Sequence, residues 1–383
     1  MKTMYPRTYA AIDLEAVLHN VGEMKALLNG EHTQIMAVIK ADGYGHGAIP
    51  IGKELEQLPY VWGYGVATVE EGVALREVGL EKPILSLGAS FPGQYVAMAE
   101  HGIRPTVFSL SMAKQLNEAC AKIGKKLSVH IKIDTGLSRL GFPVSEESVS
   151  DIAQIYALPH IIIEGIFTHF AKSDAADKEM THEQLFSFWR MCDQLKKRGI
   201  TPPFRHVSNS AAILDLPEAG LDLVRAGISI YGLWPSDEVQ KNRIDLRPAL
   251  SLKSSVVFLK EVEEGVPISY GATYVTDQRR RIATIPIGYG DGYPRSLSNK
   301  GYVLIHGKRA LICGRICMDQ FMVDVTHIPE TEEGDEVVLI GSSGNEKISM
   351  EELADLSGRF NYEFACCLGK RIPRVYLKGP KAL

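Results

Sequence analysis

The chain has 383 residues, which is too many for one small core and indicates two or three domains. With 45% hydrophobic and 23% charged residues, it has the composition of an ordinary soluble globular protein. A formal net charge of −4 argues against a nucleic-acid partner, and the absence of any signal-like or membrane-spanning stretch leads us to expect a cytoplasmic protein without membrane contact.

Strand-like and helix-like patterns alternate over the first part of the chain. Short apolar runs bounded by Gly and Pro predict strands, and helical periodicity predicts the segments between most of them. Eight strand–helix units in about 230 residues are the number and size of a (β/α)8 TIM barrel. An open doubly wound sheet, the alternative, would have fewer strands and a site at one switch point. The predicted strands are 35–39, 62–67, 83–87, 103–108, 127–133, 161–168, 204–208 and 222–230, and the predicted helices include 13–29, 46–58, 69–78, 112–123, 146–156 and 179–197.

The pattern changes near 233–235, and strand-like runs separated by Gly and Pro turns dominate from about residue 245. We therefore predict a barrel domain over 1–240 and a mostly β domain over 241–383. The strands expected in the second domain are 250–262, 281–287, 302–305, 310–313, 320–325, 336–340 and 372–377, with one helix at 350–357.

The six cysteines are scattered and form no C-x-x-C pair, so we expect free thiols, most of them in the core. No spacing of His, Cys or acidic residues is typical of a metal site, and we predict no metal.

Lys40 directly follows the first predicted strand, 35–39, and a glycine-rich turn comes next. A neutral lysine amine at the end of a buried strand can attack a carbonyl carbon. The plainer alternative is a solvated lysine at the end of an ordinary strand. The glycines match neither the P-loop nor the G-x-G-x-x-G dinucleotide spacing.

In a barrel, chemistry takes place where strands end, and the last two βα loops often bind phosphate. An amine nucleophile beside a phosphate site is typical of an anchor for pyridoxal phosphate. Taken singly, these residues have plainer alternatives: a structural histidine, a surface salt bridge and an ion pair between Lys132 and Asp134. The candidate residues at the strand ends are Lys40, Lys132, Asp134, Arg139, His169, Ser210, Arg225, Gly227 and Ile228.

The stretch AVIKADGYGHG around Lys40 closely resembles the cofactor-attachment motif of alanine racemases. The likeness extends over essentially the whole chain, with Ser208 as a small departure where alanine is usual. It recurs in KIDTGLSRLGF (132–142), THF (168–170), SNSAA (208–212), RAGISIYG (225–232), SYGATY (269–274), PIGYGDGYPR (286–295), GRICMDQ (314–320) and NYE (361–363).

The resemblance implies a homodimer in which each active site uses residues of both chains. Lys40 would hold pyridoxal phosphate and act as one base, and Tyr270 of the partner chain would act as the opposite base. Arg225 would face the pyridine nitrogen, and His169 would link it to Tyr270. The phosphate would be bound by Tyr44, Ser210, Gly227, Ile228 and Tyr362, the substrate carboxylate by Arg139 and the Met318 backbone, and Tyr289 would lie at the narrow substrate entrance.

The implied activity is the interconversion of L-alanine and D-alanine, which supplies D-alanine for peptidoglycan. Racemisation of serine by a relative stays open, because a small pocket rejects one extra hydroxyl poorly. A pyridoxal-phosphate homeostasis protein would resemble the barrel alone. A basic-amino-acid decarboxylase would carry a carboxylate where this chain has Arg225.

Lys132 is predicted to be carbamylated. A second cation beside Arg139 would repel it, whereas a partly desolvated lysine is neutral more often and can take up CO2. The carbamate would supply the anion that holds Arg139. An ion pair with Asp134 is the alternative, because residues two apart on a strand share a face.

Overall fold

The computed structural model describes residues 7–28, 30 and 32–379. Two compact units are present: a barrel unit of residues 17–43 and 48–247, and a β unit of residues 1–16, 44–47 and 248–383. The sequence-based division at 240 places the N-terminal residues with the barrel. In the structure, β1 (Thr8–Asp13) instead pairs with strands of the β unit.

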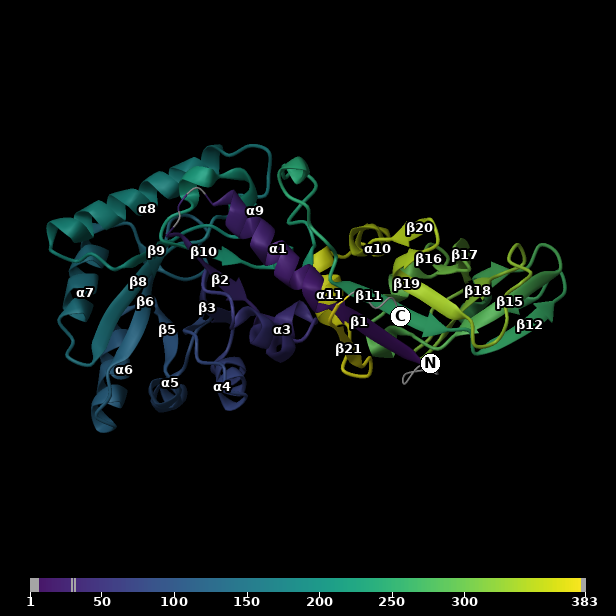
Figure 1. Cartoon of the computed structure of the whole chain (residues 1–383), viewed down its shortest axis with the longest axis horizontal. Coiled ribbons are helices and arrows are strands. Elements are labelled where there is room, and N and C mark those ends of the chain that lie inside the picture. The colour runs from purple at the N-terminus through teal and green to yellow at the C-terminus, as the bar shows by residue number, and fades with distance from the viewer. Residues whose placement is uncertain (1–6, 29, 31, 380–383) are drawn as a thin grey trace. The chain divides into compact units, whose positions relative to one another are not determined.

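Eight parallel strands of the barrel unit follow one another in the order β10-β2-β3-β4-β5-β6-β8-β9. The ends of this path meet, because the Arg225 N–H donates to the carbonyl of Ser208 at 3.1 Å. The predicted (β/α)8 barrel is therefore confirmed (Figure 1). The strands are β2 (Gln34–Val38), β3 (Val61–Val66), β4 (Ile84–Ser86), β5 (Ile103–Val107), β6 (Leu127–Asp134), β8 (Ile161–Phe167), β9 (Phe204–His206) and β10 (Leu223–Ala226), and the short β7 (Phe142–Pro143) pairs with β6.

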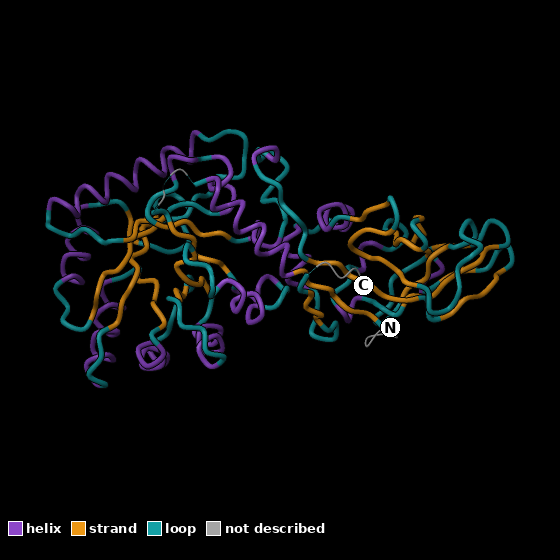
Figure 2. The backbone as a smooth tube through the Cα atoms, in the orientation of Figure 1, coloured by secondary structure: helices purple, strands orange, loops and turns teal. Residues whose placement is uncertain are grey.

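Helices lie outside these strands (Figure 2). Two helices begin at Val69 and Glu146, as the sequence predicts, and a third begins at Leu110, two residues before the predicted start. A hydroxyl caps the first turn of each: Thr68, Ser109 and Ser145 each accept a backbone N–H three residues on. The predicted helix end at residue 29 lies outside the described residues. The helices are α1 (Leu14–Leu27), α3 (Ala48–Leu55), α4 (Val69–Glu77), α5 (Tyr95–His101), α6 (Leu110–Lys122), α7 (Glu146–Tyr156), α8 (Glu179–Lys197) and α9 (Ser210–Asp215).

The β unit is built on a mostly antiparallel sheet in the order β12-β15-β18-β17-β16-β19-β11-β1-β21, with β20 beside β19. The predicted mostly β domain is confirmed. Its strands are β11 (Leu250–Ser255), β12 (Phe258–Val262), β13 (Pro267–Ile268), β14 (Tyr274–Val275), β15 (Arg280–Ile285), β16 (Tyr302–Ile305), β17 (Lys308–Cys313), β18 (Phe321–Asp324), β19 (Glu336–Ser343), β20 (Glu346–Ile348) and β21 (Arg374–Leu377), and its helices are α10 (Met350–Ser357) and α11 (Asn361–Cys367).

All six cysteines are free thiols, as predicted. The expectation that most lie in the core is wrong, because only Cys120 and Cys313 are buried. Within the described part of the chain, no helix combines the length and apolar character that crossing a membrane requires.

Candidate active site

Lys40 stands at the C-terminal end of β2 and begins α2 (Lys40–Tyr44), a turn with an unusual backbone. Ala41, Asp42, Gly43 and Tyr44 all have positive φ, between 51° and 62°. Left-handed conformations cost roughly 1–2 kcal/mol for each residue that has a Cβ. Such a turn persists only where its surroundings hold it, and strain of this kind concentrates at functional sites.

Hydrogen bonds from outside the turn supply that support. The Asp42 carboxylate accepts the N–H of Ala48 at 2.8 Å, and the Ala41 N–H donates to the Glu71 carboxylate at 2.7 Å. Glu71 also accepts the Thr68 N–H as the N3 residue of the capping box of α4. The position of Lys40 is therefore tied to the barrel wall on both sides of the turn.

Arg225 lies at the end of β10 with only 3% of its surface exposed. Its Nη1 and Nη2 donate to the carbonyls of Thr168, His206 and Val207 at 2.8–2.9 Å. Burial, with a contribution from nearby Arg139, lowers the pKa of Arg225 to about 9, so the guanidinium stays charged at neutral pH. Among the described residues its Nε has no hydrogen-bond partner, and arginine can only donate. The group therefore suits an acceptor such as an unprotonated ring nitrogen.

His169 receives a hydrogen bond from Arg225, whose Nη2 lies 3.0 Å from its Nδ1. Burial, followed by the nearby basic groups Arg225, Lys132, Arg139 and Lys40, holds the pKa of His169 well below 6.5, so its ring is neutral. Because Arg225 can only donate, His169 Nδ1 must accept, and Nε2 carries the ring proton. His169 thus presents an N–H donor away from Arg225.

Lys132 is 5% exposed, and its amine lies over the ring of Phe167 at 4.8 Å from the centroid. Burial, followed by repulsion from Arg225 and Arg139, lowers the pKa of Lys132 to about 6. Among the described residues it forms no ion pair with Asp134, so the structure contradicts the ion-pair alternative.

Asp134 instead shapes the loop that carries Arg139. One of its carboxylate oxygens accepts the N–H groups of Gly136 and Ser138, both at 3.0 Å. The loop returns to the strand at Gly141. Only glycine fits there, because a Cβ would lie 2.5 Å from the Asp134 backbone nitrogen. The loop leaves Arg139 exposed beyond the strand end.

The loops after β9 and β10 meet at Ser210. The Gly227 N–H donates to the Ser210 hydroxyl oxygen at 2.9 Å, and Ile228 follows in a buried turn. The hydroxyl hydrogen of Ser210 remains able to donate to an anion. Ser208, the departure from the usual alanine, is buried and donates its hydroxyl to the Ala219 carbonyl at 2.6 Å. Its polar group is therefore satisfied within the protein.

The β unit brings together two of the predicted phosphate ligands. Tyr44 is buried, and its ring lies 6.0 Å from that of Tyr362, which stacks in turn on Phe360 at 4.4 Å. Burial raises the pKa of Tyr44, so it stays a protonated hydroxyl that can donate to an anion.

Tyr270 and Met318 are 48 positions apart in the sequence and line one open cleft of about 370 Å³ in the β unit. Tyr270 lies in the loop between β13 and β14 and is 70% exposed, and Met318 is 52% exposed. The residues lining the cleft include no lysine, arginine or histidine; they are Ser269, Tyr270, Cys317, Met318, Asp319, Gln320 and Met322.

Tyr289 lies beside the same segment, because its N–H donates to the Cys317 carbonyl at 3.1 Å and the Gly290 N–H donates to the Met318 carbonyl at 2.8 Å. The tyrosine is 43% exposed. The structure thus places Tyr270, Met318 and Tyr289 in one region of the β unit.

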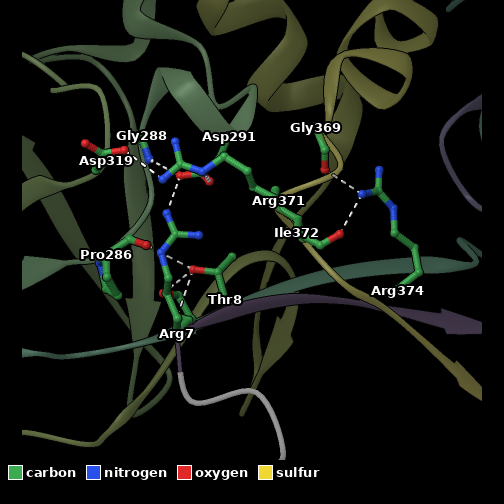
Figure 3. Close-up of polar contacts among 11 residues, drawn as sticks. Arg7, Thr8, Pro286, Gly288, Asp291, Asp319, Gly369, Arg371, Ile372 and Arg374 are labelled. Carbon is green, nitrogen blue, oxygen red and sulfur yellow. Dashed lines mark hydrogen bonds and ion pairs between the residues drawn. The ribbon is translucent and has the colours of Figure 1, made fainter.

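A buried carboxylate supports this region (Figure 3). Asp291 is fully buried; it accepts the Gly288 N–H at 3.0 Å and contacts Arg7 at 2.6 Å and Arg371 at 3.3 Å. Arg371 extends to Asp319, the residue after Met318, at 2.7 Å. The two segments that carry Tyr289 and Met318 are therefore joined by ion pairs as well as by backbone hydrogen bonds.

The predicted residues thus form two groups, one at the strand ends of the barrel unit and one on the β unit. Sequence reasoning missed His130 and His206, which are fully buried in the barrel near Arg225. His130 is two positions before Lys132 on β6, and this spacing places both on one face. The spacing of two residues from Lys132 could therefore have indicated that His130 lies near the site.

Comparisons with known proteins show the family of the chain. The family profiles "Alanine racemase, N-terminal domain" and "Alanine racemase, C-terminal domain" match residues 12–235 and 249–376. The chain is 47% identical to alanine racemase of Halothermothrix orenii over 369 residues, which cover 96% of each protein.

Solved structures give the same result. Alanine racemase of Clostridium difficile 630 in complex with cycloserine is 42% identical and has a TM-score of 0.93, with 99% of this chain and 98% of that chain covered. Alanine racemase of Bartonella henselae with covalently bound pyridoxal phosphate is 30% identical, with a TM-score of 0.86 and coverage of 97% and 99%. This chain belongs to the alanine racemase family, whose members depend on pyridoxal phosphate.

Proposed function

We propose that the protein interconverts L-alanine and D-alanine with pyridoxal phosphate held on Lys40. The observation that carries the proposal is the barrel-end group itself. It combines a lysine on a strained turn with Arg225, a buried cation that can only donate. The family membership of both units supports the same reaction.

The residues present fit the cofactor by their chemistry. Pyridoxal phosphate supplies an electron sink for the charge left when the substrate loses its Cα proton. Lys40 would bind it covalently, and the Ser210 hydroxyl with the backbone at Gly227 and Ile228 would hold its phosphate, together with Tyr44 and Tyr362. Arg225 would donate to the ring nitrogen and keep that nitrogen unprotonated.

Racemisation requires one base on each face of the Cα carbon. We assign these roles to Lys40 and to Tyr270. His169, whose Nε2–H faces away from Arg225, would donate to the Tyr270 oxygen and assist proton transfer there. Arg139 and the Met318 N–H would bind the substrate carboxylate, and Tyr289 would narrow the substrate entrance.

The two groups of residues lead us to propose a homodimer with shared sites. The cleft around Tyr270 and Met318 contains no cation of its own, and both residues are exposed. By the family resemblance, the partner chain would supply them to the barrel residues. The free cysteines agree with the predicted cytoplasmic compartment.

Other pyridoxal-phosphate proteins fit less well. A homeostasis protein resembles the barrel alone, whereas this chain also matches the C-terminal racemase domain over 249–376. A basic-amino-acid decarboxylase needs a carboxylate at the ring nitrogen, where this chain has Arg225. Serine is the competing substrate to test, because a small pocket rejects one extra hydroxyl poorly.

The proposal is tested by incubating the purified protein, with and without added pyridoxal phosphate, with single enantiomers of alanine, serine and other amino acids. Chiral chromatography then measures the opposite enantiomer. We expect cofactor-dependent conversion of alanine in both directions, faster than that of serine. Serine converted faster than alanine, or no conversion of either, would refute the assignment.

Tyr270→Ala should damage the two directions of proton exchange unequally. By analogy with the family, Tyr270 serves the L face and Lys40 the D face, so exchange of the Cα proton in heavy water should survive better from D-alanine than from L-alanine. NMR of each enantiomer measures the rates, and the visible spectrum checks that cofactor is bound. Equal losses from both enantiomers would count against two bases.

Lys132 should carry a carbamate when CO2 is present. Burial lowers the pKa of Lys132 to about 6, so most of the amine is neutral at pH 7.5, and only the neutral form reacts with CO2. Carbon-13 NMR after incubation with labelled bicarbonate should show one carbamate signal that disappears in Lys132→Ala. A spectrum without that signal at saturating bicarbonate would exclude the modification. Lys53→Ala, which alters an exposed lysine, is the matched control.

A further inference from the structure

A line of buried polar side chains runs from Arg225 through the interior of the barrel unit. Arg225 Nη1 lies 3.0 Å from His206 Nδ1, and His206 Nε2 lies 2.8 Å from His130 Nδ1. His130 Nε2 then lies 3.1 Å from a carboxylate oxygen of Glu164, which also pairs with Arg104. Both imidazoles are fully buried. The five residues come from five strands, β10, β9, β6, β8 and β5.

The hydrogen bonds along this line can run in only one direction. Arg225 cannot accept, so His206 Nδ1 must, and a neutral imidazole then carries its proton on Nε2. That N–H donates to His130 Nδ1, which places the His130 proton on Nε2 as well. The line ends at the Glu164 carboxylate, which only accepts. Any reversal would set the His206 Nδ1–H against an N–H of Arg225.

The electrostatics of the line agree with this pattern. Burial lowers the pKa of both His130 and His206, so both rings are neutral at neutral pH. Burial alone would raise the pKa of Glu164, but hydrogen bonds from His130 and Arg104 outweigh it and lower the value to about 2. Glu164 is therefore a fixed negative charge between the cations Arg104 and Arg225.

We propose that Glu164 is a positioning residue for Arg225, acting through His130 and His206. Its charge and the Arg225 guanidinium favour the same tautomers from opposite ends of the line, and His206 then offers Arg225 an acceptor that orients the guanidinium. This inference rests on the proposed function, because the oriented group is the one assigned to the cofactor ring nitrogen. Glu164 should thereby favour racemisation over transamination.

If these hydrogen bonds served stability alone, their mutation would lower the thermal stability of the protein but would not change the ratio of racemisation to transamination. The experiment therefore uses the full-length protein with selectively ¹⁵N-labelled histidine, measured by NMR without and with cofactor. The variant is Glu164→Gln, because an amide can accept from His130 or donate to it. Glu164→Asp is the conservative variant, because it keeps the negative charge.

Asp215→Asn is the control for lost stability. It breaks the ion pair with Lys178, elsewhere in the same unit.

We expect the wild-type protein to hold both His130 and His206 as neutral Nε2–H tautomers, with or without cofactor. In Glu164→Gln an amide N–H that donates to His130 Nε2 opposes the tautomers favoured by Arg225, so the tautomers should mix. Racemisation should fall by roughly tenfold, and the transaminated fraction should rise several-fold. Glu164→Asp should recover most of both properties, and Asp215→Asn should change neither.

A proton on His206 Nδ1 in the wild type would overturn the inference, as would unchanged tautomers and partition in Glu164→Gln. The tautomers measured without cofactor are independent of the racemase assignment. A wild-type protein that fails to racemise alanine would therefore refute the proposed function. The tautomers of His130 and His206 would still test whether the hydrogen bonds run from Arg225 to Glu164.

Discussion

Lys40→Ala should abolish racemisation of alanine, with a loss of at least ~10⁴-fold, and should remove the absorbance of lysine-bound cofactor at the same time. The substitution removes both the covalent anchor and one of the two proposed bases. The neighbouring backbone should remain, because the bonds from Ala48 to Asp42 and from Ala41 to Glu71 do not involve the lysine side chain. Absorbance spectra and a coupled assay of D-alanine formation measure the two losses.

Lys53→Ala provides the matched control, since Lys53 is exposed and has no proposed role. It should keep both activity and absorbance. Borohydride reduction of the Lys40→Ala variant, followed by peptide mapping, should find no pyridoxyl group on any lysine. A pyridoxyl group fixed to a different lysine in that variant would show that the anchor has been misassigned.

Arg225→Glu should lower racemisation by roughly 10²- to 10³-fold and raise the share of transamination. Arg225 can only donate, so the ring nitrogen opposite it stays unprotonated, whereas a carboxylate would let that nitrogen hold a proton. The stronger electron sink should spread negative charge into the ring and allow protonation away from Cα. The ratio of enantiomer to pyruvate formed from L-alanine measures this partition.

Arg225→Lys separates charge from geometry. Lysine keeps a cationic donor but loses the planar group that reaches the Thr168, His206 and Val207 carbonyls together. It should lose activity while keeping a partition close to that of the wild type. A wild-type partition in Arg225→Glu would remove Arg225 from the cofactor site.

The barrel could be predicted because its signals are local. Most of the buried parallel strands are short apolar runs, and helices with a side-chain N-cap follow several of them. The membership of β1 in the other sheet could not be predicted, because its partners β11 and β21 lie more than 200 residues away along the chain. Nothing in Thr8–Asp13 itself specifies which sheet it joins.

The boundaries of the longer strand-like segments in the β unit differ from the prediction. The predicted strand 250–262 is two strands, since β11 lies inside the sheet and pairs with β1, whereas β12 is the edge strand beside β15. The helix α11, which carries Tyr362, was not predicted: it has only seven residues, too few for a clear helical period.

Strand-end positions predicted the barrel half of the candidate site, because parallel strands bring their ends to one edge. Sequence did not show the left-handed turn after Lys40, in which Ala41, Asp42 and Tyr44 adopt a conformation typical of glycine. It also left open an ion pair between Lys132 and Asp134 as the alternative to a carbamate, whereas the Asp134 carboxylate caps its own loop. Short acidic side chains often bond to backbone N–H groups nearby, and this competes with ion pairing.

We propose that Lys40 of one chain and Tyr270 of another form one active site. Lys40→Ala and Tyr270→Phe, each inactive alone, should restore activity when mixed under conditions that exchange subunits. Random pairing makes half of the dimers mixed, each with one site that carries both lesions and one intact site. Roughly a quarter of the wild-type rate should therefore return. Exchange verified by native mass spectrometry, with no activity recovered, would contradict a shared site.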